Sequence, residues 1–263
     1  MSKNINESTS KSVYIYFGLA IVGILIIGLF RDSIFIRGDV GQIIITELAE
    51  GSTVYVDKVE SRTVNSTEEN LKLGKFNVGV HSILIIRSGF WPWLKEVEIK
   101  KGEKIYLSPF FAPENGSGFF INDSDPEYQS IIEGFDTLVV PGFDNRRISK
   151  DGNVAFWIDD NTIFAEWLGS DEEIPEAFCN ESDCPRVTIP LTVGGAIRNA
   201  DFYKGRSDVI VVSFGNGVFA IEIDNKNHQN FQPIYEGNSP QFLLENENAI
   251  YVLDEGILRE VRL

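Results

Sequence analysis

The residues that most often carry chemistry are scarce in this chain of 263 residues. Two histidines, His81 and His228, and two cysteines, Cys179 and Cys184, are the whole supply. The sequence contains no hydrolase elbow, phosphate-binding loop or dinucleotide fingerprint. Because most activated sites need a His, Cys or metal constellation, we expect a protein that is not an enzyme. A polysaccharide-acting enzyme with paired carboxylates stays open as an alternative, since such a pair is visible only in space.

The two cysteines are separated by four residues in the acidic stretch FCNESDC. A zinc site would need two more ligands, and the chain has only two histidines, both distant in sequence. The spacing therefore predicts a small disulfide loop between Cys179 and Cys184, which is typical of an oxidising compartment.

One further pattern could bind a cation. Asp123, Asp125 and Glu127 alternate along the sequence, as oxygen ligands do in calcium loops, but Tyr128 stands where an EF-hand loop needs glycine. We prefer a solvated turn, and calcium is the only cofactor that the sequence leaves open. A second acidic stretch, residues 171–176, has the same interpretation.

The aromatic segment Phe90-Trp91-Pro92-Trp93 is a candidate contact surface. Proline cannot join a central ladder, so this segment is expected in a loop or at a sheet edge. If both indoles are exposed, Trp91 and Trp93 would contact a sugar ring, a partner protein or the membrane interface. The alternative is that they pack against Phe110 and Phe111 where two domains meet.

Residues 13–30 contain no charge and no proline. As a helix they would be ~27 Å long, close to the thickness of a bilayer core. No small-residue cleavage site follows them, so we expect an uncleaved transmembrane anchor rather than a secretory signal or a buried core helix. Residues 1–12 would form a short cytoplasmic tail. Basic residues flank both sides of the span almost equally, and the cysteine pair favours an extracytoplasmic location for the C-terminal domains.

Charge limits the partners of the remaining chain. Residues 31–263 contain 21 basic and 38 acidic side chains, a net charge of −17. Such a surface repels nucleic acid and anionic lipid headgroups, so we expect no nucleic-acid partner. The expected partners are the bilayer itself, through residues 13–30, and an envelope protein or polysaccharide.

Residues 40–111 contain short segments rich in β-branched and aromatic side chains, separated by Gly, Asn and Asp. The pattern predicts an antiparallel β-sandwich with strands near 42–48, 53–59, 80–86, 94–99 and 104–110. Residues 53–57 (TVYVD), 79–81 (GVH) and 89–90 (GF) resemble the PEGA domain, a small extracytoplasmic sandwich related to transthyretin-like modules. The eponymous turn departs from that family, because the chain has Ala49-Glu50-Gly51-Ser52 without proline. The resemblance implies a binding or surface module and transfers no catalytic residue.

Residues 113–125 are rich in turn formers and are interpreted as a boundary. Beyond them, in residues 125–263, a hydrophobic strand, a tight turn and a second strand recur near residues 153, 208 and 248. Units of this length resemble blades of WD-type or TolB-type β-propellers. Only about three units fit where closed propellers usually need four, so we expect a small or incomplete propeller, with a second sandwich as the alternative. Residues 130–143 are expected to close the exposed edge or to start a fourth unit.

Together these features predict an all-β ectodomain on one N-terminal transmembrane helix, located at the cell membrane. The expected function is non-catalytic binding, adhesion or scaffolding at the cell envelope. A ligand sensor is a further alternative, although twelve N-terminal residues leave no room for an output domain.

Overall fold

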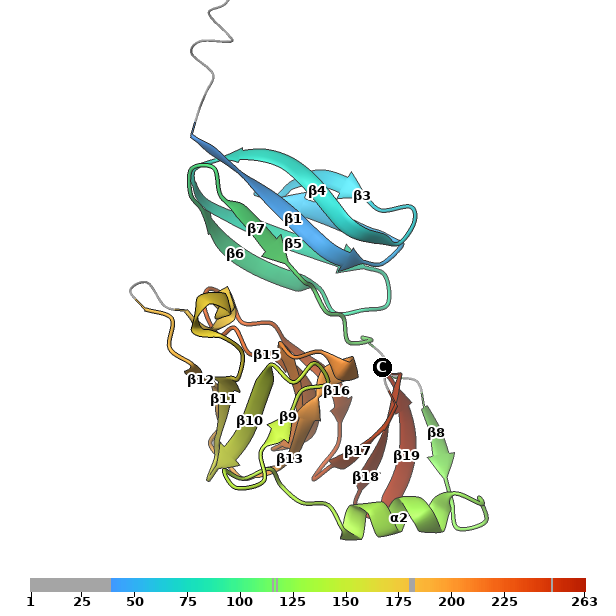
Figure 1. Ribbon diagram of the computed structural model, residues 1–263. Coiled ribbons are helices and arrows are strands. Elements are labelled where there is room, and N and C mark those ends of the chain that lie inside the picture. Colours follow the sequence, from blue (N-terminus) through green and yellow to red (C-terminus); the bar gives the residue numbers. More distant parts are fainter. Residues whose placement is uncertain (1–38, 115, 117, 180–182, 247) are drawn as a thin grey trace, which may run out of the picture.

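The computed structural model describes residues 39–114, 116, 118–179, 183–246 and 248–263 (Figure 1). The expected tail and transmembrane span, residues 1–30, lie outside these ranges. Within them, none of the helices has the length and apolar character to cross a membrane. The described residues form five β-sheets with a single α-helix, so the all-β prediction is confirmed for this part of the chain.

The first lobe consists of strands β1–β7, which form two facing sheets. One sheet has the strand order β4-β1-β7 and the other β3-β2-β5-β6. The strands are β1 (Val40–Leu48), β2 (Ser52–Val56), β3 (Val59–Thr63), β4 (Glu68–Asn77), β5 (Gly79–Arg87), β6 (Trp93–Ile99) and β7 (Lys104–Leu107). Strand β1 pairs in parallel with β7, which corrects the expectation of a purely antiparallel sandwich. The polar strands β3 and β4 were not predicted, because they lack an apolar alternation.

The second lobe consists of β8–β19 and helix α2, and its three sheets have four strands each (Figure 1). Sheet I contains β9 (Arg147–Ile148), β10 (Val154–Asp159), β11 (Thr162–Trp167) and β12 (Val187–Thr192). Sheet II contains β13 (Ile197–Phe202), β14 (Val209–Phe214), β15 (Gly217–Glu222) and β16 (Phe231–Glu236). Sheet III contains β17 (Gln241–Asn246), β18 (Ala249–Asp254), β19 (Ile257–Arg262) and β8 (Gly118–Ile121). All pairings in these sheets are antiparallel. Apart from β8, strands that are neighbours in each sheet are also neighbours in sequence, as in a propeller blade.

Strand β8 completes sheet III, although its residues were interpreted as a linker. It pairs with β19 in the register Ile121 opposite Leu258. Gly118 allows this close approach, because a Cβ atom there would overlap the Glu260 carbonyl. The expectation that residues 130–143 close this edge is wrong. Instead, helix α2 (Tyr128–Asp136) covers one face of sheet III, burying Ile131 and Phe135 against Leu258.

Three apolar clusters hold the described part together. One lies between sheets I and II and includes Phe156, Ile163 and Ile210. The smallest lies between α2 and sheet III. The largest joins the lobes, because it contains first-lobe residues such as Ile43 and Trp93 together with Val211 and Phe242 of the second lobe. The two lobes therefore share a continuous core.

Candidate binding site

The junction between the lobes is built around a buried charge network. The Lys95 ammonium on β6 lies 2.9 Å from Glu222 and 3.0 Å from Asp224. The side chains of Lys95 and Glu222 are only 7% and 9% exposed. The Trp93 indole N–H donates to the second oxygen of Glu222 over 2.6 Å. Burial raises the pKa of Glu222, and the neighbouring Lys95 offsets part of that effect. The network fixes β6 to the end of β15.

Side-chain amides complete this junction by pairing with the main chain. Strand β6 is the edge of its sheet, and the amide of Asn230 accepts from the Leu94 N–H and donates to the Leu94 carbonyl, both over 2.8 Å. Gln232 likewise accepts from the Ala112 N–H over 2.7 Å and donates to the Phe110 carbonyl. Each amide supplies the donor and acceptor that a neighbouring strand would supply, so buried main-chain groups here are satisfied.

The structure does not show the exposed tryptophan pair that was considered as a contact surface. Trp93 is 2% exposed and belongs to the shared core. Trp91 is half-buried and packs against the same cluster, which also contains Phe110 and Phe111. These side chains therefore pack at the junction between the lobes, as the alternative expected.

A cleft of about 450 Å³ lies where the first strands of the three second-lobe sheets approach one another. Its apolar walls come from two sides: Leu138, Val139 and Pro141 follow helix α2, and Phe242 and Leu243 belong to β17. The side chain of Asn199 on β13 bonds both main-chain groups of Phe242, which ties β13 to β17 beneath the cleft. This is the same amide device as at the lobe junction.

The charged groups of the cleft are Arg147 on β9 and Asp201 on β13. Their closest atoms are 3.3 Å apart, and the side chains are 47% and 24% exposed. Burial raises the pKa of Asp201, and the nearby Arg147 and the Phe202 N–H lower it in part. Asp201 is the only carboxylate among the described residues that line the cleft. The site therefore offers one ion pair that is open to solvent.

An apolar rim adjoins the cleft, which we define as Val139, Val140, Phe143 and Ile148. These side chains are 63%, 38%, 63% and 59% exposed. The Phe143 ring contacts the buried Trp157, and the Arg146 guanidinium lies 5.1 Å from the centre of the same ring. Since Arg146 is also paired with Glu166, the exposed phenyl ring is held in place on sheet I.

Exposed carboxylates surround the rim. Asp136 precedes the rim in sequence, and Asp144 directly follows Phe143. The carboxylates of Asp136, Asp144, Asp159 and Asp160 are all exposed. The Ile158 N–H donates to the Pro141 carbonyl over 2.7 Å, which brings the Asp159–Asp160 turn beside the rim. Within the described ranges, none of these four carboxylates forms an ion pair. The rim is therefore an apolar surface with four exposed carboxylates beside it.

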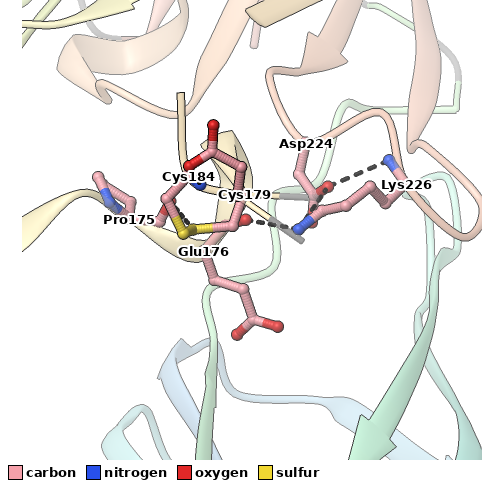
Figure 2. Close-up of a disulfide and its surroundings, with 7 residues drawn as sticks. Pro175, Glu176, Cys179, Cys184, Asp224 and Lys226 are labelled. Carbon is pink, nitrogen blue, oxygen red and sulfur yellow. Dashed lines mark hydrogen bonds and ion pairs between the residues drawn. A yellow bond between two sulfur atoms is a disulfide. The ribbon is translucent and has the colours of Figure 1, made fainter. Parts of the chain in front are cut away.

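The cysteines lie between β11 and β12, and a disulfide joins Cys179 to Cys184. Figure 2 shows the bridge beside Glu176, whose carbonyl accepts from the Lys226 ammonium. Lys226 belongs to the polar loop after β15, whose neighbour Asn225 donates to the Ile189 carbonyl of β12 over 2.7 Å. This loop, residues 224–230, thus contacts β6, β12 and the cysteine segment.

The calcium candidates form a turn before α2. Asp125 accepts from the Asn122 N–H over 2.8 Å, so one of its oxygens is already used within the turn. Asp123 and Glu127 are exposed. No group of three or more His, Cys, Asp or Glu side chains suited to a metal occurs in the parts of the chain that are described.

Neither histidine lies in the cleft. The ring nitrogens of His81 face two acceptors, the Asp57 carboxylate at 2.7 Å and the Asn77 carbonyl at 2.8 Å. His228 is exposed, 3.7 Å from Glu96. Both contacts are at the surface of the first lobe or at its junction.

Comparisons with known proteins give no family for this chain. No family model matches it, and no curated protein matches it. Among solved structures, the β-propeller domain of Cps50 (Swd1) from Myceliophteria thermophila is similar, with 7% sequence identity and a TM-score of 0.31. That likeness covers 86% of this chain and 97% of the other. At this identity and score it supports no argument about fold or function, so the blade-like description depends on the strand order alone.

Sequence reasoning missed the cleft and the junction for the same reason. Arg147 and Asp201 are far apart in sequence, and Lys95 and Glu222 are 127 residues apart. Lys95 in β6 is a sequence signal that could have revealed the junction. It occupies an inward position in a strand whose residues alternate between buried and exposed. A charge at an inward position indicates a buried partner.

Proposed function

We propose that this chain is a membrane-anchored, extracytoplasmic binding protein of the cell envelope that is not an enzyme. Residues 13–30 would hold it in the bilayer, with a PEGA-like first lobe and an incomplete propeller as the second. The cleft and its rim would be the binding surface. The shared core and the buried junction support this role, since they would keep that surface at a fixed orientation to the first lobe.

Binding is favoured over catalysis because the described lining of the cleft contains a single carboxylate, that of Asp201. A glycosidase of the ordinary type needs two carboxyl groups on either side of the scissile bond. Asp201 has no second carboxylate beside it among the described lining residues, and its partner is Arg147. The geometry thus favours binding over polysaccharide cleavage.

Membrane placement is tested with the full-length chain carrying a C-terminal tag in a bacterial host. We expect the chain in carbonate-washed membranes and expect protease added to spheroplasts to remove the tag. A soluble chain, or a tag protected from external protease, would contradict the proposed location.

The absence of catalysis is tested by incubating the purified full-length chain with envelope polysaccharide and measuring new reducing ends. We expect none above the blank. Release of reducing ends that the Asp201→Asn variant abolishes would show that the enzyme alternative is correct.

A further inference from the structure

We propose that the cleft and its rim bind a basic polypeptide segment of a partner protein, with apolar side chains seated in the cleft and Lys or Arg side chains on the surrounding carboxylates. This inference rests on the proposed function, because it names the chemistry of the ligand for the same surface. It commits to a protein partner, and polysaccharide becomes an outcome of the test.

The apolar rim is continuous with the cleft. Val139 belongs to both, and Phe143 projects from the same segment with 63% of its surface exposed. Contiguous exposed apolar side chains rimmed by polar groups are typical of protein interaction sites. Because the Phe143 ring is fixed against Trp157 and Arg146, little conformational freedom is lost when a partner covers it.

Negative charge gathers beside the rim. Four exposed carboxylates, those of Asp136, Asp144, Asp159 and Asp160, surround the rim without ion pairs in the described structure. The two nearby arginines are already matched, Arg146 by Glu166 and Arg147 by Asp201. Lys150, two residues after Ile148, is the other cation close to the rim in sequence, so the four carboxylates outnumber it. The surface therefore has excess negative charge, and a basic segment complements it.

The distribution of charge along the chain supports the same partner. Residues 39–112 contain ten acidic and nine basic side chains, whereas residues 113–263 contain 27 acidic and ten basic ones. The negative charge is thus a property of the lobe that carries the cleft. Such a field speeds the approach of a cationic partner and repels acidic ones.

The test uses the full-length chain in nanodiscs of phosphatidylcholine, with empty nanodiscs as the blank. The probes are three short fluorescent peptides of equal length: alternating Lys and Leu, alternating Lys and Ser, and alternating Glu and Leu. We expect saturable binding of the Lys/Leu peptide, weaker binding of Lys/Ser and none of Glu/Leu. Binding of Lys/Ser as tight as Lys/Leu would overturn the role of the apolar cleft.

Variants separate this site from general attraction to an acidic protein. The double variant Asp136→Lys, Asp144→Lys should weaken Lys/Leu binding at least about tenfold. The matched control Glu172→Lys, Glu173→Lys changes the same charge at exposed positions in the segment between β11 and β12. An equal loss in the control would show that binding is non-specific and would overturn the proposal.

Phe143→Ser tests the apolar contact without altering charge. It should weaken Lys/Leu binding by roughly three- to tenfold and leave Lys/Ser binding unchanged. Circular dichroism confirms that each variant is folded. If the chain instead binds envelope polysaccharide saturably without turnover and ignores all three peptides, the inference fails while the proposed binding function stands.

Discussion

The lobe junction and the cleft each contain an ion pair, and the two pairs differ in their access to water. Lys95 and Glu222 are 7% and 9% exposed, whereas Arg147 and Asp201 are 47% and 24% exposed. At the junction the charges are surrounded by further donors and acceptors, including the Trp93 indole and the Asn230 amide. The buried junction charges hold the two lobes in one arrangement. The cleft charges are still in contact with water, which a ligand could replace.

Buried side-chain amides occur in both regions. Asn230 pairs with Leu94 across the junction, and Asn199 pairs with Phe242 beneath the cleft. These side chains are 6% and 4% exposed. Both regions thus have the same main-chain pairing device, so the difference between them lies in the ion pairs.

The largest effect is expected at the junction charge. Glu222→Ala leaves Lys95 buried with Asp224 as its remaining carboxylate, and should lower the free energy of unfolding by about 3 kcal/mol. Urea unfolding followed by tryptophan fluorescence measures this. Glu98→Ala, an exposed position on β6, is the control and should change little. A loss below about 1 kcal/mol would mean that the network does not hold the lobes together.

The amide devices should come next and should be similar to each other. Asn230→Leu leaves the Leu94 N–H and carbonyl without their side-chain partner, and should cost about 2 kcal/mol. Asn199→Leu should cost somewhat less, because Phe242 loses the same two bonds whereas Asn230 also donates to the buried Glu222 carboxylate. The same urea titration compares them. A large cost for one and none for the other would break the equivalence of the two regions.

His81 and Asp57 form a pair of intermediate exposure on the first lobe, at 14% and 52%. Burial alone would lower the pKa of His81, but hydrogen bonds to the Asp57 carboxylate and the Asn77 carbonyl outweigh it and raise that pKa. The hydrogen bond to His81 lowers the pKa of Asp57 despite partial burial. Protonated His81 is therefore favoured in the folded state.

The sign of the resulting pH dependence follows from these directions. The contribution of His81 is complete below its unfolded pKa of about 6.5 and is lost as pH rises through the raised folded value. The contribution of Asp57 is complete above about 3.9 and is lost as pH falls through its lowered value. Solvent screening keeps the effect below about 1 kcal/mol. The free energy of unfolding of the wild-type chain should fall as the pH rises from 5 to 8.5. The His81→Gln variant should show a smaller fall. An unchanged fall would contradict a stabilising role of protonated His81.

The smallest change in stability is expected at the cleft. Arg147→Ala removes an ion pair that is open to solvent, and should change the free energy of unfolding by less than about 1 kcal/mol. Thermal unfolding of the Arg147→Ala and Glu222→Ala variants, measured side by side, compares the two losses of stability. A cost as large as that of Glu222→Ala would show that the cleft pair is structural, and the comparison between the two regions would fail.

The sequence predicted what short segments encode. The hairpins β10–β11, β14–β15 and β18–β19 combine apolar strands with tight turns, and their positions are confirmed. Pairings between distant segments were not predictable, since β8 and β19 belong to opposite ends of the second lobe's sequence. Helix α2 has nine residues, including Gly134, and lacks a side-chain cap, so no local signal marked it. The cleft is missing from the sequence reasoning because three such distant segments form it.

Hydrogen–deuterium exchange of the full-length chain in nanodiscs, with and without the Lys/Leu peptide, shows which surface the peptide covers. We expect slower exchange in the segment from α2 to β9 and in β13, with β6 and residues 224–230 unchanged. Slower exchange at the lobe junction, or no change in the segment after α2, would contradict the assignment of the cleft and its rim as the binding surface.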